Sequence, residues 1–172
     1  MNKEIYYETE MDSPVGKLTL CANDDGALVG IWLNGQKYYE YGLNGDVKTK
    51  DSLEIFDRTK KWLSEYFAGK SPNINKLKLS PIGSSKFRQR VWQILCEIPY
   101  GKTTTYGEIA DIIAKERGIE RMSAQAVGGA VGHNPISIII PCHRVVGKNG
   151  DLTGYAGGLN VKKYLLSLEK AI

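Results

Sequence analysis

The stretch TYGEIADIIAKERGIERMSAQAVGGAVG (residues 105–132) contains two helix patterns in succession, separated by a short turn. Thr105 is followed three residues later by Glu108, which is a capping-box pattern, and Gly118 marks the end of the first helix. Ser123 is placed to cap the second helix. Two helices joined by a short turn predict a helix-turn-helix.

The second of these helices is rich in small residues, although glycine is a poor helix former. We therefore expect its backbone to lie close to a neighbour. Tight packing against another helix and insertion into a nucleic-acid groove both explain the pattern. A helix with so few long side chains suits the narrow minor groove better than the wide major groove. Its small residues are Ala124, Ala126, Gly128, Gly129, Ala130 and Gly132.

A reactive segment follows this helix. The apolar run 136–140 is β-branched and too short for a helix, so it predicts a buried strand that ends at PCHRV (residues 141–145). A thiol beside an imidazole is a candidate nucleophile, because the thiolate attacks and histidine can take its proton near neutral pH. Since adjacent residues on a helical turn do not face each other, we expect a water to link Cys142 and His143.

A histidine base needs a third group that accepts a hydrogen bond from its other ring nitrogen. Glu169 follows the last predicted helix, which Asn160 is expected to cap, and it either points back into the protein or is a solvated carboxylate. Asn134 is either a helix-ending residue or a clamp on the cysteine turn. The expected inward positions of the last helix are Val161, Tyr164, Leu165 and Leu168.

A cysteine, a histidine and a glutamate in this pattern support two classes of function. One is a thiol hydrolase that forms acyl-enzymes, and the other is a DNA-binding protein whose thiol accepts an alkyl group. A helix-turn-helix directly before the cysteine favours a reaction on DNA.

The first part of the chain has a different pattern. Leu18, Leu20 and Ala22 alternate with polar residues between glycine-containing turns, which predicts short antiparallel strands. A helix pattern begins after Ser52 and ends at Gly69.

A polar, proline-containing connector then leads to a further predicted helix, which Ser84 or Ser85 caps and Pro99 ends. We predict a mixed α/β fold of the α+β type. A small β-rich N-terminal domain of residues 1–80 is expected to pack on a mostly helical C-terminal domain of residues 81–172.

The composition excludes several classes of protein. The 172 residues are 42% hydrophobic and 24% charged, which is typical of a globular protein and not of a disordered one. The longest apolar run is far shorter than the ~20 residues that cross a bilayer, so we expect no membrane partner. The first dozen residues lack a signal-peptide pattern and three widely spaced cysteines do not suggest disulfides, so we expect a cytoplasmic protein. With no CxxC pair and only two histidines, we expect no metal site.

Charge is distributed unevenly along the chain. The net charge is +4, but residues 1–85 hold 11 basic and 12 acidic residues, whereas residues 86–172 hold 12 and 7. The excess in the second half indicates a polyanionic partner or a solvated basic surface.

The motif PCHRVV (141–146), preceded by GGAVGHNP (128–135) and followed by TGYAGGL (153–159), resembles the O6-alkylguanine-DNA alkyltransferases. The N-terminal SPVGKL (13–18) is similar to the β-rich domain of the same family. This resemblance implies direct repair, in which the alkyl group of O6-methylguanine, and more weakly of O4-methylthymine, moves to Cys142 without a cofactor. It implies a monomer that binds double-stranded DNA through the minor groove.

The resemblance also implies roles for individual residues. Cys142 would be the nucleophile, His143 the water-linked base and Glu169 its orienting partner, with Asn134 as a hydrogen-bonding support and Tyr106 as a donor to the extruded base. The guanine pocket would comprise Val145, Tyr155, Ala156 and Gly157, and the DNA-binding residues would be Ser123, Ala124, Gln125, Ala126, Gly128 and Arg144.

This chain departs from the family pattern at two of these positions. Gln125 stands where many members have an arginine that fills the gap left by the flipped base, so we expect weaker or slower base capture. Ala156 replaces a serine that some members use near O6. A non-catalytic binder of alkylated bases and a cysteine hydrolase remain the alternative functions.

Overall fold

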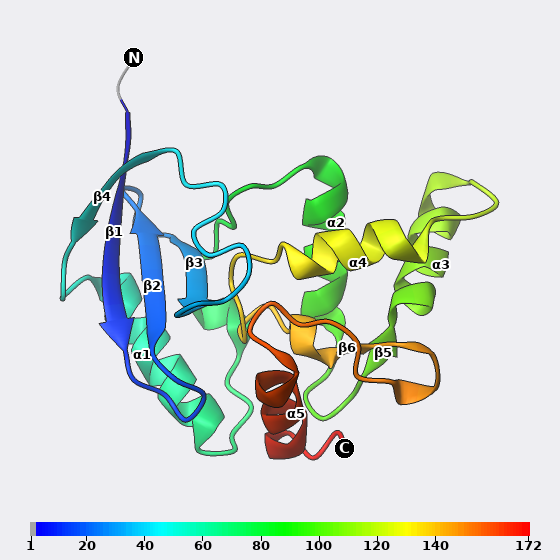
Figure 1. Cartoon of the computed structure of the whole chain (residues 1–172). Helices are drawn as coiled ribbons and strands as arrows, with labels where there is room; N and C mark the ends of the chain where they lie inside the picture. Colours follow the sequence, from blue (N-terminus) through cyan, green and yellow to red (C-terminus); the bar gives the residue numbers. More distant parts are fainter. Residues whose placement is uncertain (1–2) are drawn as a thin grey trace. The chain divides into compact units, whose positions relative to one another are not determined.

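The computed structural model describes residues 3–172, which form two compact units. The first unit runs to Gly83 and also includes Pro135–Ile139. The second comprises Ser84–Asn134 and Ile140–Ile172. The mixture of an N-terminal sheet and a helical C-terminal part confirms the predicted α+β class (Figure 1).

The first unit is built on a four-stranded sheet of order β3-β2-β1-β4. Strands β1 (Glu4–Met11), β2 (Leu18–Asn23) and β3 (Leu28–Leu33) are antiparallel neighbours, as predicted. Strand β4 (Gly45–Thr49) pairs with β1 in parallel, so the prediction of antiparallel strands alone was incomplete. Helix α1 (Glu54–Phe67) packs against the sheet and is capped off before Gly69, in agreement with the sequence pattern (Figure 1).

The predicted strand over 136–140 is wrong. The run is buried, but Ile136 makes only a single bridge, to Ile31 of β3. Ile138 has a positive φ of 72°, and the amide of Ile139 donates to the carbonyl of Ser137 at 2.8 Å, so the backbone turns where a strand would stay extended.

The second unit contains four α-helices, of which three precede the cysteine. Helix α2 (Lys86–Glu97) begins at the cap Ser85, and α3 (Tyr106–Arg117) begins with the predicted capping box and ends at Gly118 in the left-handed conformation. Helix α4 (Ala124–Gly132) begins at the predicted cap Ser123 and packs against α2 and α3, which confirms the helix-turn-helix (Figure 1). Short strands β5 (Thr104–Thr105) and β6 (Val145–Val146) pair in parallel.

The last helix, α5 (Leu159–Leu168), differs from the prediction in its start and in its buried face. Gly158 occupies the cap position without a side-chain hydrogen bond, so Asn160 is not the cap. Tyr164 is 39% exposed, whereas Lys162, Leu165 and Leu166 are buried. The helix is therefore rotated relative to the expected orientation, and a lysine lies on its inner face.

Candidate active site

The turn that carries the cysteine is fixed by one carbonyl. Ile140 O accepts hydrogen bonds from Asn134 Nδ2 and from the amide of Cys142, both at 2.8 Å. Cys142 then opens a 3-10 turn, η2 (Cys142–Arg144), and its side chain is almost fully buried. Asn134 also hydrogen-bonds the Cys142 thiol, so it acts on both the turn and the sulfur. The geometry supports the interpretation of Asn134 as a clamp.

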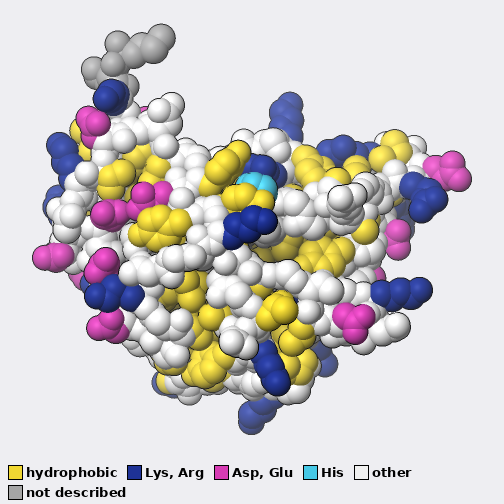
Figure 2. All heavy atoms as spheres, in the orientation of Figure 1, with side chains coloured by type: hydrophobic (Ala, Val, Ile, Leu, Met, Phe, Trp, Pro, Cys, Tyr) yellow, Lys and Arg dark blue, Asp and Glu magenta, His cyan; other side chains and the backbone are white. Residues whose placement is uncertain are grey.

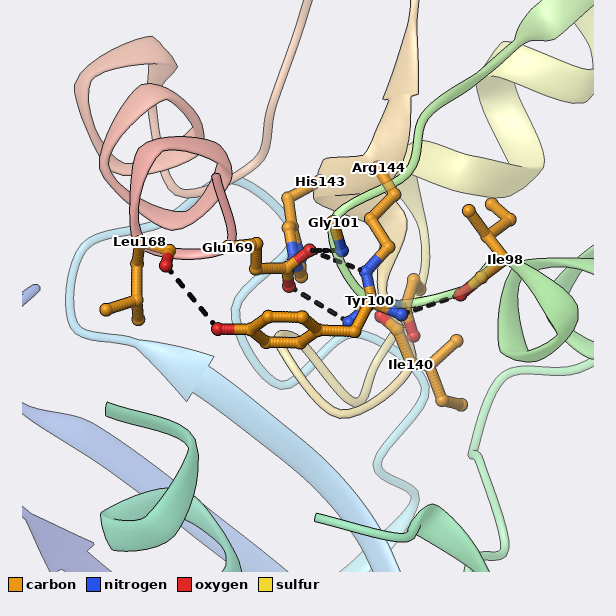
Figure 3. Close-up of polar contacts among 9 residues, drawn as sticks. Ile98, Tyr100, Gly101, Ile140, His143, Arg144, Leu168 and Glu169 are labelled. Atoms are coloured by element: carbon orange, nitrogen blue, oxygen red, sulfur yellow. Dashed lines mark hydrogen bonds and ion pairs between the residues drawn. The ribbon is translucent and has the colours of Figure 1, made fainter. Parts of the chain in front are cut away.

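His143 and Glu169 form a buried pair, as the sequence suggested. His143 Nε2 lies 2.7 Å from Glu169 Oε1, and both side chains are fully buried. Figure 3 shows the carboxylate between the imidazole and the guanidinium of Arg144. Glu169 is therefore directed into the protein and is not a solvated terminal carboxylate.

Arg144 binds the same carboxylate in a bidentate arrangement. Its Nε donates to Oε2 of Glu169 at 2.9 Å, and its Nη2 donates to Oε1 at 3.0 Å (Figure 3). Its Nη1 donates to the carbonyl of Ile98 at 2.7 Å, and only 11% of the side chain is exposed. The predicted DNA contact of Arg144 would have to compete with these bonds.

The end of α5 is anchored around this carboxylate. The amide of Gly101 donates to Glu169 Oε2 at 3.3 Å, and the hydroxyl of Tyr100 donates to the carbonyl of Leu168 at 3.4 Å (Figure 3). The guanidinium carbon of Arg144 lies 5.7 Å from the centre of the Tyr100 ring. These contacts fix the position of Glu169 from both sides of the helix end.

Tyr106 is brought towards the cysteine segment by the small β5–β6 pair. Thr104 pairs with Val145 and Thr105 with Val146, so the start of α3 is tied to the chain just after the cysteine. The Tyr106 hydroxyl donates to the carbonyl of Thr153 at 3.2 Å.

Of the predicted pocket residues, Val145 is buried and Tyr155, Ala156 and Gly157 are partly exposed. The Tyr155 side chain is among the groups that oppose the rise in the pKa of the Cys142 thiol, so one member of this loop acts on the sulfur.

The predicted DNA-binding residues of α4 lie on its outer side. Ser123, Ala124, Gln125 and Ala126 are exposed, and Gly128 is partly buried. A Cβ added at Gly128 would lie 3.8 Å from the Tyr106 ring, whereas one added at Gly129 or Gly132 would meet nothing within 4 Å. The surface over α4 is largely white and yellow in Figure 2. The packing of α4 against α2 and α3 confirms the interpretation of tight packing, whereas insertion of its exposed side into a groove stays a prediction.

Burial and charge set the protonation states at this site. Burial raises the pKa of the Cys142 thiol, and the hydrogen bond from Asn134 and the positive charge of Lys162 oppose that rise. Burial lowers the pKa of His143, while its bond to Glu169 raises it. Although burial acts in the opposite direction, the hydrogen bonds from His143 and Arg144 lower the pKa of Glu169 to about 2.

The sequence did not predict that two side chains belong to this site. Arg144 was predicted to bind DNA, and no role was predicted for Lys162. The missed signal is the spacing of seven residues from Lys162 to Glu169, which places both on one face of a helix with Leu165 and Leu166. No such spacing rule links Arg144 to Glu169, which lies 25 residues further along the chain.

Within residues 3–172, no three His, Cys, Asp or Glu side chains come together as metal ligands. In the same range, no helix has the length and apolar character that crossing a membrane requires.

A buried thiol in a clamped turn, a histidine–glutamate pair and a preceding helix-turn-helix define a cysteine-dependent protein of the DNA-acting class. Residues 86–171 match the family model described as "6-O-methylguanine DNA methyltransferase, DNA binding domain", and residues 5–81 match "6-O-methylguanine DNA methyltransferase, ribonuclease-like domain". The chain belongs to the 6-O-methylguanine DNA methyltransferase family.

The relatives cover nearly the whole chain. A methylated-DNA–protein-cysteine methyltransferase of Methanosarcina barkeri is 43% identical over 166 residues, which is 96% of this chain and 98% of the relative. One of Haemophilus influenzae is 42% identical over 164 residues, 95% of this chain and 86% of the relative. The crystal structure of Mycobacterium tuberculosis OGT in complex with DNA is similar with a TM-score of 0.79 and 41% identity, covering 97% of this chain and 93% of that one.

Proposed function

We propose that this protein repairs DNA by moving the alkyl group of O6-alkylguanine, and more weakly of O4-alkylthymine, irreversibly to Cys142. The observation that carries this proposal is the Cys142 thiol, held by Asn134 in a turn that leads directly into the buried His143–Glu169 pair. The family supports the substrate class, because its members are described as 6-O-methylguanine DNA methyltransferases.

His143 acts as the base through one defined tautomer. A carboxylate with a pKa of about 2 is ionised at neutral pH and can only accept hydrogen bonds. The imidazole Nε2 must therefore carry the hydrogen that faces Glu169, which leaves the lone pair on Nδ1 to accept the thiol proton through a water. Because burial lowers the pKa of His143, the ring is neutral and able to accept that proton at pH 7.

The alkyl transfer is a displacement at saturated carbon. The bond from Cys142 Sγ to the alkyl carbon forms as the bond from that carbon to O6 breaks, and the electron pair stays on guanine. Tyr106 donates a proton to the departing base, and the thiol proton taken up by His143 is then passed to Tyr106 through solvent, so that guanine leaves protonated and both residues return to their starting states. The product is a thioether without a carbonyl for water to attack, so each protein acts once.

The exposed side of α4 is proposed to enter the minor groove while the damaged nucleotide leaves the stack. Extrusion costs a few kcal/mol and is easiest for a mispaired base. The exposed residues Ser123, Ala124, Gln125 and Ala126 would meet the DNA. The loop with Tyr155, Ala156 and Gly157 would receive the base beside Val145. We propose that a monomer in the cytoplasm carries out this reaction.

The test is the stoichiometry of methyl transfer. Excess duplex with a radiolabelled O6-methylguanine is incubated with reduced protein, and the label bound to protein is counted over time. We expect the label to stop at one methyl group per protein, and the Cys142→Ala variant to bind the duplex without accepting label.

Two other outcomes would overturn the proposal. A wild-type protein that binds the lesion but gains no label would be a non-catalytic binder of alkylated bases. Repeated turnover on an ester or peptide substrate, again without label, would indicate a cysteine hydrolase.

A further inference from the structure

The basic residues of the first unit are concentrated in one part of its sequence. Residues 1–47 hold 3 basic and 8 acidic residues, whereas residues 48–85 hold 8 and 4. The nearly neutral charge of residues 1–85 is therefore the balance of an acidic part, which contains β1, β2 and β3, and a basic part, which contains α1 and the connector after it. An excess of one charge on a surface attracts ligands of the opposite charge.

Part of this positive charge lines two hollows in the surface of the first unit. Lys50, Arg58, Lys76 and Lys78 are among the residues that line the larger one, which has a volume of about 510 Å³. Arg58, Lys61 and Lys76 line the smaller one, of about 320 Å³. Because the two hollows share Arg58 and Lys76, they adjoin, and we call them together the basic groove.

The charge is least balanced in the smaller hollow. Glu65 is the one carboxylate among its lining residues, against the cations of Arg58, Lys61 and Lys76. Arg58 forms an ion pair with Glu54 at 2.7 Å, but within the described residues 3–172 neither Lys61 nor Lys76 forms an ion pair. Like charges three or four residues apart on a helix destabilise it, so Arg58 and Lys61 favour an anion beside α1.

The larger hollow has a more even charge, because three carboxylates line it besides its four cations: Asp24, Asp25 and Glu54. We therefore place the centre of the basic groove at the smaller hollow. Lys50, which follows β4, and Lys78 are exposed cations that flank this centre.

The cations of the smaller hollow lie on a fixed scaffold. Trp62 Nε1 donates to the carbonyl of Asn73 at 3.2 Å, which ties the connector segment that carries Lys76 to α1. The Trp62 ring is 6% exposed and stacks on Tyr66 with 5.7 Å between the ring centres. A ring buried in this way offers no free face for stacking with bases, so the hollow presents a ligand mainly with charge.

We propose that the basic groove is a second DNA-contacting surface, which binds the phosphate backbone of double-stranded DNA by charge and reads no bases. Arg58 and Lys61 are about 4.5 Å apart along the axis of α1, and a duplex carries one negative charge about every 1.7 Å, so neighbouring cations can meet neighbouring phosphates. Residues 86–171 match the DNA-binding domain of the family, which makes DNA the polyanion that this chain already meets. A second contact on the same chain then gains from the high effective concentration of phosphate.

The test follows the backbone amide signals of the full chain by NMR while a short undamaged duplex is added at low salt. We expect the signals of α1 and of η1 (Ile74–Lys76) to shift, in addition to those of α4. The double variant Lys61→Gln, Lys76→Gln should lose the shifts in α1 and keep those in α4. The double variant Lys17→Gln, Lys37→Gln removes two exposed lysines from the acidic part and should behave like the wild type.

Two outcomes of this titration would overturn the inference. Shifts confined to residues 84–172 would show that the duplex contacts the second unit alone. Poly-glutamate that shifts the α1 signals at a lower concentration than the duplex does would assign the basic groove to an acidic protein instead of DNA.

A second measurement uses the salt dependence of the affinity that the α1 signals report. Each phosphate contact contributes about 0.9 to the slope of log affinity against log salt, so Lys61→Gln should lower the slope by about that amount and Lys17→Gln should not. An unchanged slope in Lys61→Gln would overturn the contact. The inference does not rest on alkyl transfer: absence of methyl transfer by the wild type would overturn the proposed function and leave the result for the basic groove unaffected.

Discussion

At the scale of single residues, the Arg144 guanidinium binds the Glu169 carboxylate, and the carboxylate binds the neutral imidazole of His143. Arg144 and the amide of Gly101 fix the carboxylate of Glu169, and that carboxylate fixes the tautomer of His143. Any change that neutralises Glu169 removes the acceptor for His143 Nε2 and leaves the Arg144 guanidinium buried without its partner. The glutamate is therefore expected to contribute to stability and, in the proposed function, to the chemistry of His143.

Acid should unfold the protein through this residue. The pKa of Glu169 is about 2 in the folded protein against an ordinary value of 4.5. A carboxyl whose pKa is lowered by folding stabilises fully above its unfolded pKa, and this stabilisation is lost as the pH falls from about 4.5 to about 2. We expect a loss on the order of 3 kcal/mol in the free energy of unfolding, measured by urea denaturation across that range.

Two variants separate Glu169 from the other carboxyl groups. Glu169→Gln should be less stable than the wild type at pH 7 and should show a shallower decrease in stability below pH 4.5. Glu120→Gln, which changes an exposed residue in the turn before α4, should keep the wild-type slope. A Glu169→Gln protein with the full wild-type slope would show that another group causes the acid sensitivity.

At the scale of elements, the start of α3 determines where Tyr106 lies. Thr105 Oγ1 accepts a hydrogen bond from the amide of Glu108 at 3.1 Å, and Glu108 Oε2 accepts one from the amide of Thr105 at 2.8 Å. Thr105 also belongs to β5, which pairs with β6 after the cysteine. One short segment thus ends a strand, caps a helix and positions the proposed donor.

Removal of this cap should cost stability. We expect Thr105→Ala to lower the free energy of unfolding by about 1 kcal/mol, because the amide of Glu108 in the first helical turn loses its partner, Thr105 Oγ1. Thr103→Ala, at an exposed position two residues earlier, is the matched control and should change little. Equal stability of the two variants in urea denaturation would contradict the importance of the capping box.

The exposed start of α4 allows a test of the departure at Gln125. We expect Gln125→Arg to bind lesion-containing duplex more tightly and to accept the alkyl group faster, since the added cation can reach phosphate and fill the gap left by the base. Gln89→Arg adds the same charge at an exposed position of α2 and serves as the control. The prediction for Gln125 would be wrong if Gln125→Arg kept the wild-type DNA affinity and transfer rate, or if Gln125→Arg and Gln89→Arg behaved alike.

Local signals in the sequence predicted the helices well and the irregular segments poorly. The capping box at Thr105, the cap at Ser123 and the left-handed Gly118 were read correctly because each depends on near neighbours in the chain. The turn in 136–140 could not be read, because its β-branched residues favour a strand and only the structure shows the positive φ of Ile138.

The side chains of the candidate site were also predicted in part. Cys142, His143 and Glu169 followed from chemistry and motif, but the fork of Arg144 on Glu169 joins segments far apart in the sequence. The buried face of α5 was misjudged because a lysine is normally assigned to the surface. Burial of Lys162 depends on three carbonyls that its own sequence position does not reveal.

At the scale of the whole molecule, the uneven charge agrees with a DNA-binding C-terminal half. Residues 86–172 carry 12 basic and 7 acidic residues, and residues 86–171 match the DNA-binding domain of the family. Lys and Arg contacts with phosphate release counterions, so the affinity should fall as salt increases.

Binding and chemistry can be separated in one variant. We expect Cys142→Ala to bind duplex DNA with an affinity whose logarithm decreases linearly with the logarithm of salt concentration, as measured by fluorescence anisotropy. The wild type should give the same slope with an unmethylated duplex, which offers no alkyl group for transfer. An affinity independent of salt would contradict an electrostatic contact between the basic half and the phosphate backbone.

The central claim is that one sulfur takes the alkyl group permanently, and peptide mass spectrometry tests it most directly. Reduced wild-type protein is incubated with an equimolar duplex that contains O6-methylguanine, digested, and all three cysteine peptides are compared. We predict one added methyl group on the peptide with Cys142, none on those with Cys21 or Cys96, and an equal loss of methyl from the duplex. Unmodified Cys142 with a still methylated duplex would contradict the account, as would a methyl group on either of the other cysteines.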